Sequence, residues 1–250
     1  MKDCENKYLG EIKRMNCGAM AKIIRYASSR DIDVEFEDGY ISKNKSYHNF
    51  KNGQITNPRY PTVCGVGYLD GETIKNEFGE TLNSYHVWRN MLDRCYNKKC
   101  CNYKNYGAVG VTVCEEWKSY AVFKEWFNDN YYELDDERVE LDKDILIDGN
   151  NIYSPNTCIF VPITINLMFK GHKRKNDLPK GIKRKGKKYT ARITKHKQEY
   201  YLGIFNTKEE AYSSYINARN LYILELAEFY KETIPNRLYK RLIEIANIVK

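Results

Sequence analysis

A carboxylate, an amine and two carboxamides, groups that can bind a metal ion or a proton, lie between residues 141 and 169. The stretch reads LDKDILIDGNNIYSPNTCIFVPITINLMF. The alternation in LDKDIL predicts a strand, IDGNN a turn, SPNT a second loop, and CIFVP a short strand that stops at Pro162. ITINLMF then predicts the start of a helix. The candidates Asp142, Lys143, Asn156 and Asn166 are therefore expected on a strand, a loop and a helix that follow one another.

The motifs around this stretch resemble those of phage HNH proteins, small metal-finger nucleases named for a His-Asn-His trio. From Ser84 to Phe169 the chain carries, in order, WxxMxxRCYN, YxxYG, VCxxW, FxxW, LDKDI and YSPNTCIFVP. The resemblance implies that Asp142 is a metal ligand, that Asn156 orients the catalytic residue of the first strand, and that Asn166 completes the metal site. It also implies a ββα-metal fold for this part of the chain, with Mg²⁺ as the cofactor of an active site.

Lys143 stands where that family has its first histidine, the general base that takes a proton from water. A general base works best with a pKa near the working pH, and an unperturbed lysine has a pKa of about 10.4. Asp142 and Asp144 flank Lys143, and negative charges favour the protonated ammonium. We therefore expect a degenerate core with little or no cleavage activity. In the alternative interpretation, LDKD is a charged strand edge and the asparagines only close turns.

The charge of the chain changes abruptly in its second half. Residues 115–144 carry eleven acidic and four basic side chains, a net of −7, whereas residues 170–201 carry thirteen basic and two acidic ones, a net of +11. The second segment alone exceeds the formal net charge of the whole chain, which is +8. Tyr189, Ile193, Tyr200 and Tyr201 interleave with the basic residues in strand-like order, which a solvated tail does not need. The pattern predicts a basic sheet.

Three short strands and then one helix are expected from Gly181 onward. Thr207 and Glu210 fit a capping box that opens the helix. The skeleton G-I…Y-x-A-x-I…L-G-x-F-x-T-x-E-E-A runs from Gly181 to Ala211 and resembles the Apetala-type DNA-binding domain. One side of the helix is expected to carry Ala211, Tyr212, Tyr215 and Leu221.

In the Apetala-type family a three-stranded sheet enters the major groove, so the resemblance implies double-stranded DNA as the partner. Arginine can read guanine edges with two hydrogen bonds, whereas lysine mainly neutralises phosphates. Alternate strand positions face opposite ways, so Arg192 and the residues two away are expected to share a face. The candidate DNA contacts are Lys183, Arg184, Lys187, Tyr189, Arg192, Lys195 and Tyr201.

The chain as a whole is expected to be α+β and to form three domains. Residues 1–58 contain the β-prone runs AKIIRY, DIDVEF and YISKN between turn signals, which predicts a small β-barrel-like module or curled sheet. Residues 59–170 form the HNH-like domain, whose first helix places Tyr85, Trp88 and Cys95 on one face together with Met91 or Leu92. Residues 177–250 form the Apetala-type domain with a C-terminal helix. The side chains expected to be buried on that last helix are Leu238, Leu242, Ile245 and Val249.

Composition points to a cytoplasmic protein with no membrane partner. No run approaches the roughly 18 apolar residues of a membrane span, and the N-terminus lacks the apolar core of a signal peptide. The eight cysteines are expected to be reduced thiols. A zinc site built from Cys95, Cys100 or Cys101, and Cys114 is not favoured, because the chain has no CxxC pair. Buried small side chains are the better interpretation of these cysteines.

The sequence thus predicts a phage or mobile-element protein that binds double-stranded DNA and carries a degenerate HNH-like core. Two other classes stay open. One is an active homing-type nicking endonuclease, in which Asp142 and Asn166 hold Mg²⁺ and His86 or His172 supplies the base. The other is a phage inhibitor protein that binds a host nuclease. Mg²⁺-dependent nicking, salt-dependent DNA binding without cleavage, and capture of a host protein distinguish the three.

Overall fold

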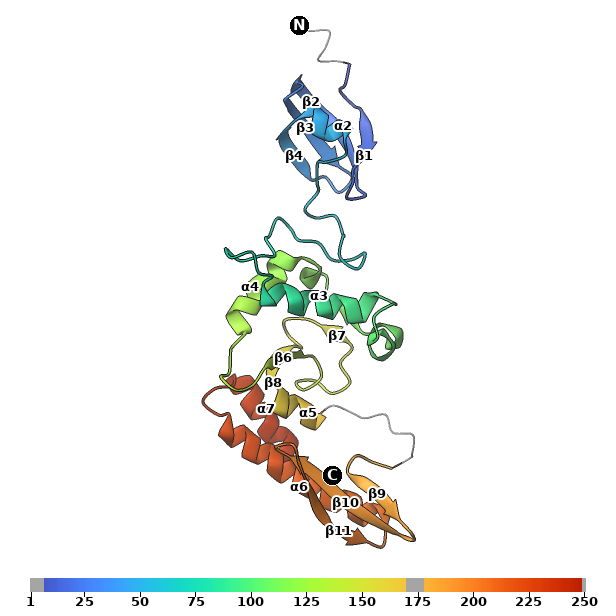
Figure 1. Ribbon diagram of the computed structural model, residues 1–250, viewed down its shortest axis with the longest axis vertical. Coiled ribbons are helices and arrows are strands. Elements are labelled where there is room, and N and C mark those ends of the chain that lie inside the picture. Colours follow the sequence, from blue (N-terminus) through green and yellow to red (C-terminus); the bar gives the residue numbers. More distant parts are fainter. Residues whose placement is uncertain (1–6, 170–177, 249–250) are drawn as a thin grey trace. The chain divides into compact units, whose positions relative to one another are not determined.

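The computed structural model describes residues 7–169 and 178–248 and has the expected α+β fold (Figure 1). The chain divides into two compact units. Unit 1 holds the residues up to Asp129 together with Asn151–Tyr153, and unit 2 holds Asn130–Asn150 together with the residues from Ser154 onward. Within the described ranges, every helix is too short or too polar to span a bilayer.

Unit 1 begins with an antiparallel sheet in the order β1-β2-β3-β4. Its strands are β1 (Ile12–Arg14), β2 (Met20–Ser28), β3 (Asp31–Phe36) and β4 (Ile41–Lys45), followed by the short helix α2 (Tyr47–Lys51). The β-prone runs predicted from the sequence lie in β2, β3 and β4. Ile23, Ile32, Val34 and Phe50 form the centre of its core. This part of unit 1 is therefore a small sheet closed on one side by a single helical turn.

The rest of unit 1 is built around helix α3 (Asn83–Tyr96). Its buried face carries Tyr85, Trp88, Met91, Leu92 and Cys95, which confirms the helical face predicted from the spacing. The indole nitrogen of Trp88 donates to the carbonyl of Trp117, at 2.7 Å, so the largest side chain of this face is also satisfied as a donor. The remaining elements are η1 (Tyr103–Asn105), η2 (Gly107–Val109), β5 (Thr112–Val113), η3 (Glu116–Lys118), α4 (Tyr120–Asn130) and β7 (Ile152–Tyr153), which pairs with β5.

Unit 2 combines a strand–strand–helix segment with a three-stranded sheet. The first part consists of β6 (Val139–Asp142), its antiparallel partner β8 (Ile159–Pro162) and α5 (Ile163–Phe169); the second consists of β9 (Ile182–Lys185), β10 (Lys188–Lys195), β11 (Gln198–Phe205), α6 (Lys208–Phe229) and α7 (Asn236–Asn247). One hydrophobic core runs through both parts, since Val161 and Ile165 belong to the same buried cluster as Ile182, Ile193 and Leu226. The two parts of unit 2 therefore stabilise each other.

Three local expectations differ from the structure. The strand expected over LDKDIL ends at Asp142, because the Asp142 carboxylate accepts hydrogen bonds from the amides of Asp144 and Ile145 and turns the chain. On α6, Tyr212 and Leu221 are exposed. The buried stripe of α6 instead contains Ala211, Tyr215, Tyr222, Ile223, Leu226 and Ala227, which follow the helical repeat more closely. On α7, Leu238 and Leu242 are buried as expected and Ile245 is half-buried, while Val249 lies outside the described residues.

Candidate functional site

The sheet of unit 2 is joined by two tight turns. Residues Gly186 and Lys187 connect β9 to β10, with a positive φ of 62° at Gly186. His196 and Lys197 connect β10 to β11, and both have positive φ, 46° and 65°. Two successive residues with positive φ are typical of a type I′ turn, whose twist matches that of the strands it joins. Short turns of this kind hold the three strands in a fixed register.

One face of this sheet is covered by α6. Ile182, Ala191 and Ile193 alternate with polar residues along the strands and are buried in the same core as Ala211 and Tyr215 of α6. The capping box predicted at the start of this helix is confirmed, since the side chains of Thr207 and Glu210 each bond the other's backbone amide. The helix is thereby anchored at the point where it leaves the sheet.

The opposite face of the sheet, which we call the open face, is basic. Side chains alternate along a strand, and directly paired residues of neighbouring strands lie on one side. The residues that pair or alternate with Arg192 on this face are Lys183, Lys185, Lys188, Thr190, Thr194, Glu199, Tyr201 and Ile204. Its three lysines are exposed, and Lys185 lies directly across from Lys188. The open face therefore presents four cationic groups and a single carboxylate, that of Glu199.

A β-bulge decides which side chain lies beside Arg192. The register between β10 and β11 shifts between Ala191 and Arg192, so that Ala191 pairs with Gly203 while Arg192 pairs with Tyr201. Without the shift, Arg192 would pair with Leu202. The guanidinium of Arg192 lies 5.7 Å from the centre of the Tyr201 ring, within the range of a cation–π contact. The bulge thus puts an exposed tyrosine beside the only arginine of the open face.

Arg192 is also paired with Glu199 at the surface. Its Nη1 donates to Glu199 Oε2 at 2.5 Å, and the two side chains are 40% and 48% exposed. The hydrogen bond from Arg192 lowers the pKa of Glu199. An ion pair between two side chains this exposed adds little stability, because solvent screens it. Another anion or hydrogen-bond acceptor can therefore replace Glu199 as the partner of Arg192 at little cost.

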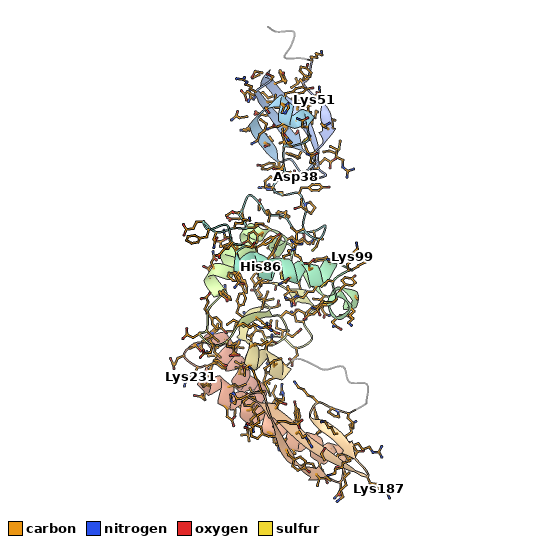
Figure 2. All side chains as sticks on the ribbon, in the orientation of Figure 1. Asp38, Lys51, His86, Lys99, Lys187 and Lys231 are labelled. Carbon is orange, nitrogen blue, oxygen red and sulfur yellow. The ribbon has the colours of Figure 1, made fainter. Side chains whose placement is uncertain are left out.

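The structure brings together some of the predicted DNA contacts and separates others. Lys183, Arg192 and Tyr201 share the open face. Lys187 lies in the β9–β10 turn, and Figure 2 shows it projecting from the end of the sheet. The remaining three, Arg184, Tyr189 and Lys195, lie on the side of α6.

Two of these three are engaged there. Nζ of Lys195 lies 3.0 Å from the carboxylate of Glu225 on α6 and 5.0 Å from the centre of the Tyr222 ring. Tyr189 packs against the core. Arg184 is exposed at the edge of the sheet, where its Nε donates to the carbonyl of Gly186 at 3.2 Å. Lysine 195 is thus a link between sheet and helix.

Sequence reasoning missed Lys185 and Lys188. Both are exposed on the open face, and both follow from strand alternation: Lys185 is two residues from Lys183, and Lys188 is four residues from Arg192. Counting in steps of two from these residues would have found them.

The strand–strand–helix segment, β6, β8 and α5, places the first of its candidate residues, Asp142, at the end of β6. Asp142 Oδ1 accepts from Asp144 N at 2.8 Å and from Ile145 N at 2.7 Å. Burial raises the pKa of Asp142, and the two backbone hydrogen bonds oppose that rise because they stabilise the carboxylate. One carboxylate oxygen of Asp142, the candidate metal ligand, therefore already accepts two backbone hydrogen bonds that hold the loop in place.

Lys143 is buried and bonded within its own loop. The residue is 6% exposed, and its Nζ donates to Asp144 Oδ1 at 2.5 Å and to the carbonyl of Asn150 at 2.6 Å. Asn150 returns a hydrogen bond from its side-chain amide to the carbonyl of Lys143, at 2.8 Å. A residue held at both ends in this way closes the loop between positions 143 and 150.

The two candidate asparagines have different surroundings. Asn166 on α5 is 5% exposed and donates from Nδ2 to Glu140 Oε2, at 2.9 Å. Because Glu140 and Asp142 are two apart on β6, Asn166 lies toward the face that carries Asp142. Asn156 is exposed in the loop before β8, and its carbonyl accepts from Arg237 of α7 at 2.6 Å. Asp142 and Asn166 therefore lie on the same side of β6, whereas the backbone carbonyl of Asn156 is hydrogen-bonded to the C-terminal helix α7.

The side chains that could bind a metal ion lie apart from one another in the described residues. Across residues 7–169 and 178–248, no three His, Cys, Asp or Glu side chains gather in a way that could hold a metal ion. Burial raises the pKa of the Cys114 thiol to about 11 and that of the Cys64 thiol to about 12, so both thiols are protonated near neutral pH. Of the candidate bases, His86 is an exposed residue of α3 in unit 1, and His172 lies outside the described residues.

Comparisons with known protein families, with curated proteins and with solved structures found no match to this chain.

Proposed function

We propose that this protein binds double-stranded DNA, that the open face of the β9–β11 sheet enters the major groove, and that the β6–β8–α5 segment is a degenerate HNH-like core. The observation that carries the proposal is the open face itself, with Lys183, Lys185, Lys188 and Arg192 on one side of a rigid sheet. Clustered cations on one face of a folded element are the electrostatic footprint of a nucleic-acid site. The strand–strand–strand–helix order and the motif skeleton from Gly181 to Ala211 support an Apetala-type assignment.

On the open face, the lysines and Arg192 would have different roles in DNA binding. The exposed lysines neutralise phosphates, which sets affinity without reading sequence. Arg192 is the group that can read a guanine edge, because its fork of donors matches the O6 and N7 acceptors. Tyr201 stacks beside Arg192 and restricts its orientation. Specificity is therefore expected to depend on Arg192 and affinity on the lysines.

The bonding of Lys143 supports a degenerate core. A general base must reach the water that it deprotonates, whereas the ammonium of Lys143 is enclosed and donates to Asp144 and Asn150. Lys143 therefore closes the loop between positions 143 and 150 through its hydrogen bonds. The order β6, β8, α5 and the shared face of Asp142 and Asn166 support descent from a ββα-metal nuclease.

Binding to duplex DNA tests the proposal. Arg192→Ala is expected to weaken binding to a duplex selected from a random pool by about 1–3 kcal/mol and binding to unselected duplex much less, because a base contact is lost. Lys187→Ala should weaken both to a similar extent. Lys240→Ala, which removes an exposed lysine from α7, is the charge-matched control and should leave both affinities unchanged. Equal losses for Arg192→Ala on the two duplexes would show that the sheet contacts only the DNA backbone.

An active Mg²⁺-dependent nicking endonuclease is the second candidate, and the approach of Asn166 and Asp142 to one face favours it. Conversion of supercoiled plasmid to the nicked form, lost in Asp142→Ala and in the presence of a chelator, would establish it. Plasmid that stays supercoiled under conditions in which it is bound would support the degenerate core.

A further inference from the structure

A second basic surface lies on unit 1, at the C-terminal end of α3. Between Arg94 and Cys114 the sequence has four basic residues and no acidic one. Arg94 belongs to α3, and the other three, Lys98, Lys99 and Lys104, lie in residues 97–110, which we call the basic loop. All three lysines are exposed, and Figure 2 shows Lys99 projecting outward at this end of the helix.

The basic loop is packed rigidly against α3. Gly107 approaches the helix so closely that a Cβ at this position would lie 2.0 Å from the carbonyl oxygen of Cys95. The guanidinium of Arg94 lies between two rings, 5.2 Å from the centre of Tyr106 and 5.1 Å from that of Tyr153. These contacts fix both the loop and strand β7 to the helix. The three lysines are therefore displayed from an ordered surface.

These lysines have no acidic partner within the described residues. The nearest carboxylate in the sequence, Asp93, already accepts from Cys64 at 3.2 Å and from the side chain of Asn97 at 3.0 Å, and it lies 3.7 Å from Arg89 Nε. Lys98, Lys99 and Lys104 form no ion pair in the part of the chain that the structure describes. Three exposed positive charges on one loop, without a counter-charge, attract a polyanion.

We infer that the basic loop is a second DNA-backbone contact, in which Lys98, Lys99 and Lys104 bind phosphates of the duplex. This inference rests on the proposed function, which gives duplex DNA as the partner of this chain. Lysine is a point charge without the planar fork that reads base edges, so the loop adds affinity and no sequence preference.

The test uses the full-length chain and a duplex of unselected sequence, with the dissociation constant measured by fluorescence anisotropy over a range of salt concentrations. The triple variant Lys98→Gln, Lys99→Gln, Lys104→Gln removes the three charges and keeps polar side chains. Each phosphate contact contributes about −0.9 to the slope of log K against log salt, which is about fivefold in affinity near 0.15 M salt. We expect the triple variant to bind about 100-fold more weakly, with a slope less steep by about 2.7.

The matched control is Lys43→Gln, Lys45→Gln, Lys51→Gln, which removes three exposed lysines from the N-terminal sheet and helix of the same unit. The inference is overturned if this control loses as much affinity, because the loss then follows net charge alone. It is also overturned if the basic-loop variant binds like the wild type while Lys185→Gln, Lys188→Gln weakens binding, an outcome that leaves the proposed function standing. If the basic-loop variant loses affinity and the sheet variant does not, the loop contact is supported and the sheet proposal fails. If the wild-type protein binds no duplex at low salt, both proposals fail.

Discussion

Lysines in two regions of unit 2 have opposite surroundings, and the difference shows what each can do. On the open face, Lys185 and Lys188 lie across from each other in solvent, so each ammonium can exchange water for a phosphate. In the loop after β6, Lys143 is 6% exposed and donates to Asp144 and to the carbonyl of Asn150. An exposed lysine therefore provides a charge that can bind an anion, whereas the buried Lys143 provides a hydrogen-bond donor that stabilises its own loop.

The two parts of unit 2 cannot be tested by separating them, because they share one hydrophobic core. Val161 and Ile165 share a core with Ile193 and Leu226, and Arg241 of α7 donates from Nε to the carbonyl of Ile145 at 2.9 Å. Removing the C-terminal sheet and helices would expose apolar side chains of the β6–β8–α5 segment. Point substitutions that leave this core intact are therefore the cleaner experiments.

The largest expected effect is on catalysis. Lys143→His places an imidazole, with an unperturbed pKa of about 6.5, beside Asp142. If the degenerate core lacks only its base, Mg²⁺-dependent nicking of plasmid should rise by about 10²–10⁴, the usual contribution of general-base catalysis. The gain should disappear when Asp142→Ala or Asn156→Ala is added. A wild-type protein that nicks faster than Lys143→His would show that the lysine is itself a working catalytic residue.

The next effect concerns lysines on the two faces of the sheet. Lys185→Gln, Lys188→Gln should lower affinity for duplex DNA by about 30-fold near 0.15 M salt, because two phosphate contacts are lost, and should reduce the salt slope by about 1.8. Lys195→Gln removes a lysine that is paired with Glu225 on the helix side, so its effect on DNA binding should be small. Binding titrations at several salt concentrations measure both. A larger loss for Lys195→Gln would place the DNA on the side of α6.

The smallest expected effect concerns stability. Lys143→Met should lower the free energy of unfolding by about 1–3 kcal/mol, because the part-buried hydrogen bonds from the ammonium to Asp144 and to the carbonyl of Asn150 are lost. Lys188→Met, at an exposed position, should change it by less than about 0.5 kcal/mol. Urea denaturation followed by circular dichroism gives both values. Equal changes in the free energy of unfolding for the two variants would contradict a stabilising role of Lys143 in its loop.

Local patterns in the sequence determined several parts of this protein. The spacing of Tyr85, Trp88 and Cys95 predicted the buried face of α3, because apolar side chains at helical intervals can be buried together only in a helix. Thr207 and Glu210 predicted the start of α6, since a capping box is formed by residues three apart. The order of three strands before that helix was also predicted, because each strand is bounded by its own turn residues.

Only the tertiary structure decided where the functional side chains lie. The bulge that brings Tyr201 beside Arg192 depends on how β10 and β11 pair, and pairing is a contact between strands that no local pattern records. The burial of Lys143 depends on the carbonyl of Asn150, seven residues away, and on a core that draws on all of unit 2. The sequence does not distinguish Lys195 from the neighbouring basic residues, yet its ion pair with Glu225 of α6, thirty residues away, holds it on the face of the sheet that α6 covers. A basic residue's type follows from the sequence, whereas its availability for a partner depends on which other groups the fold brings to it.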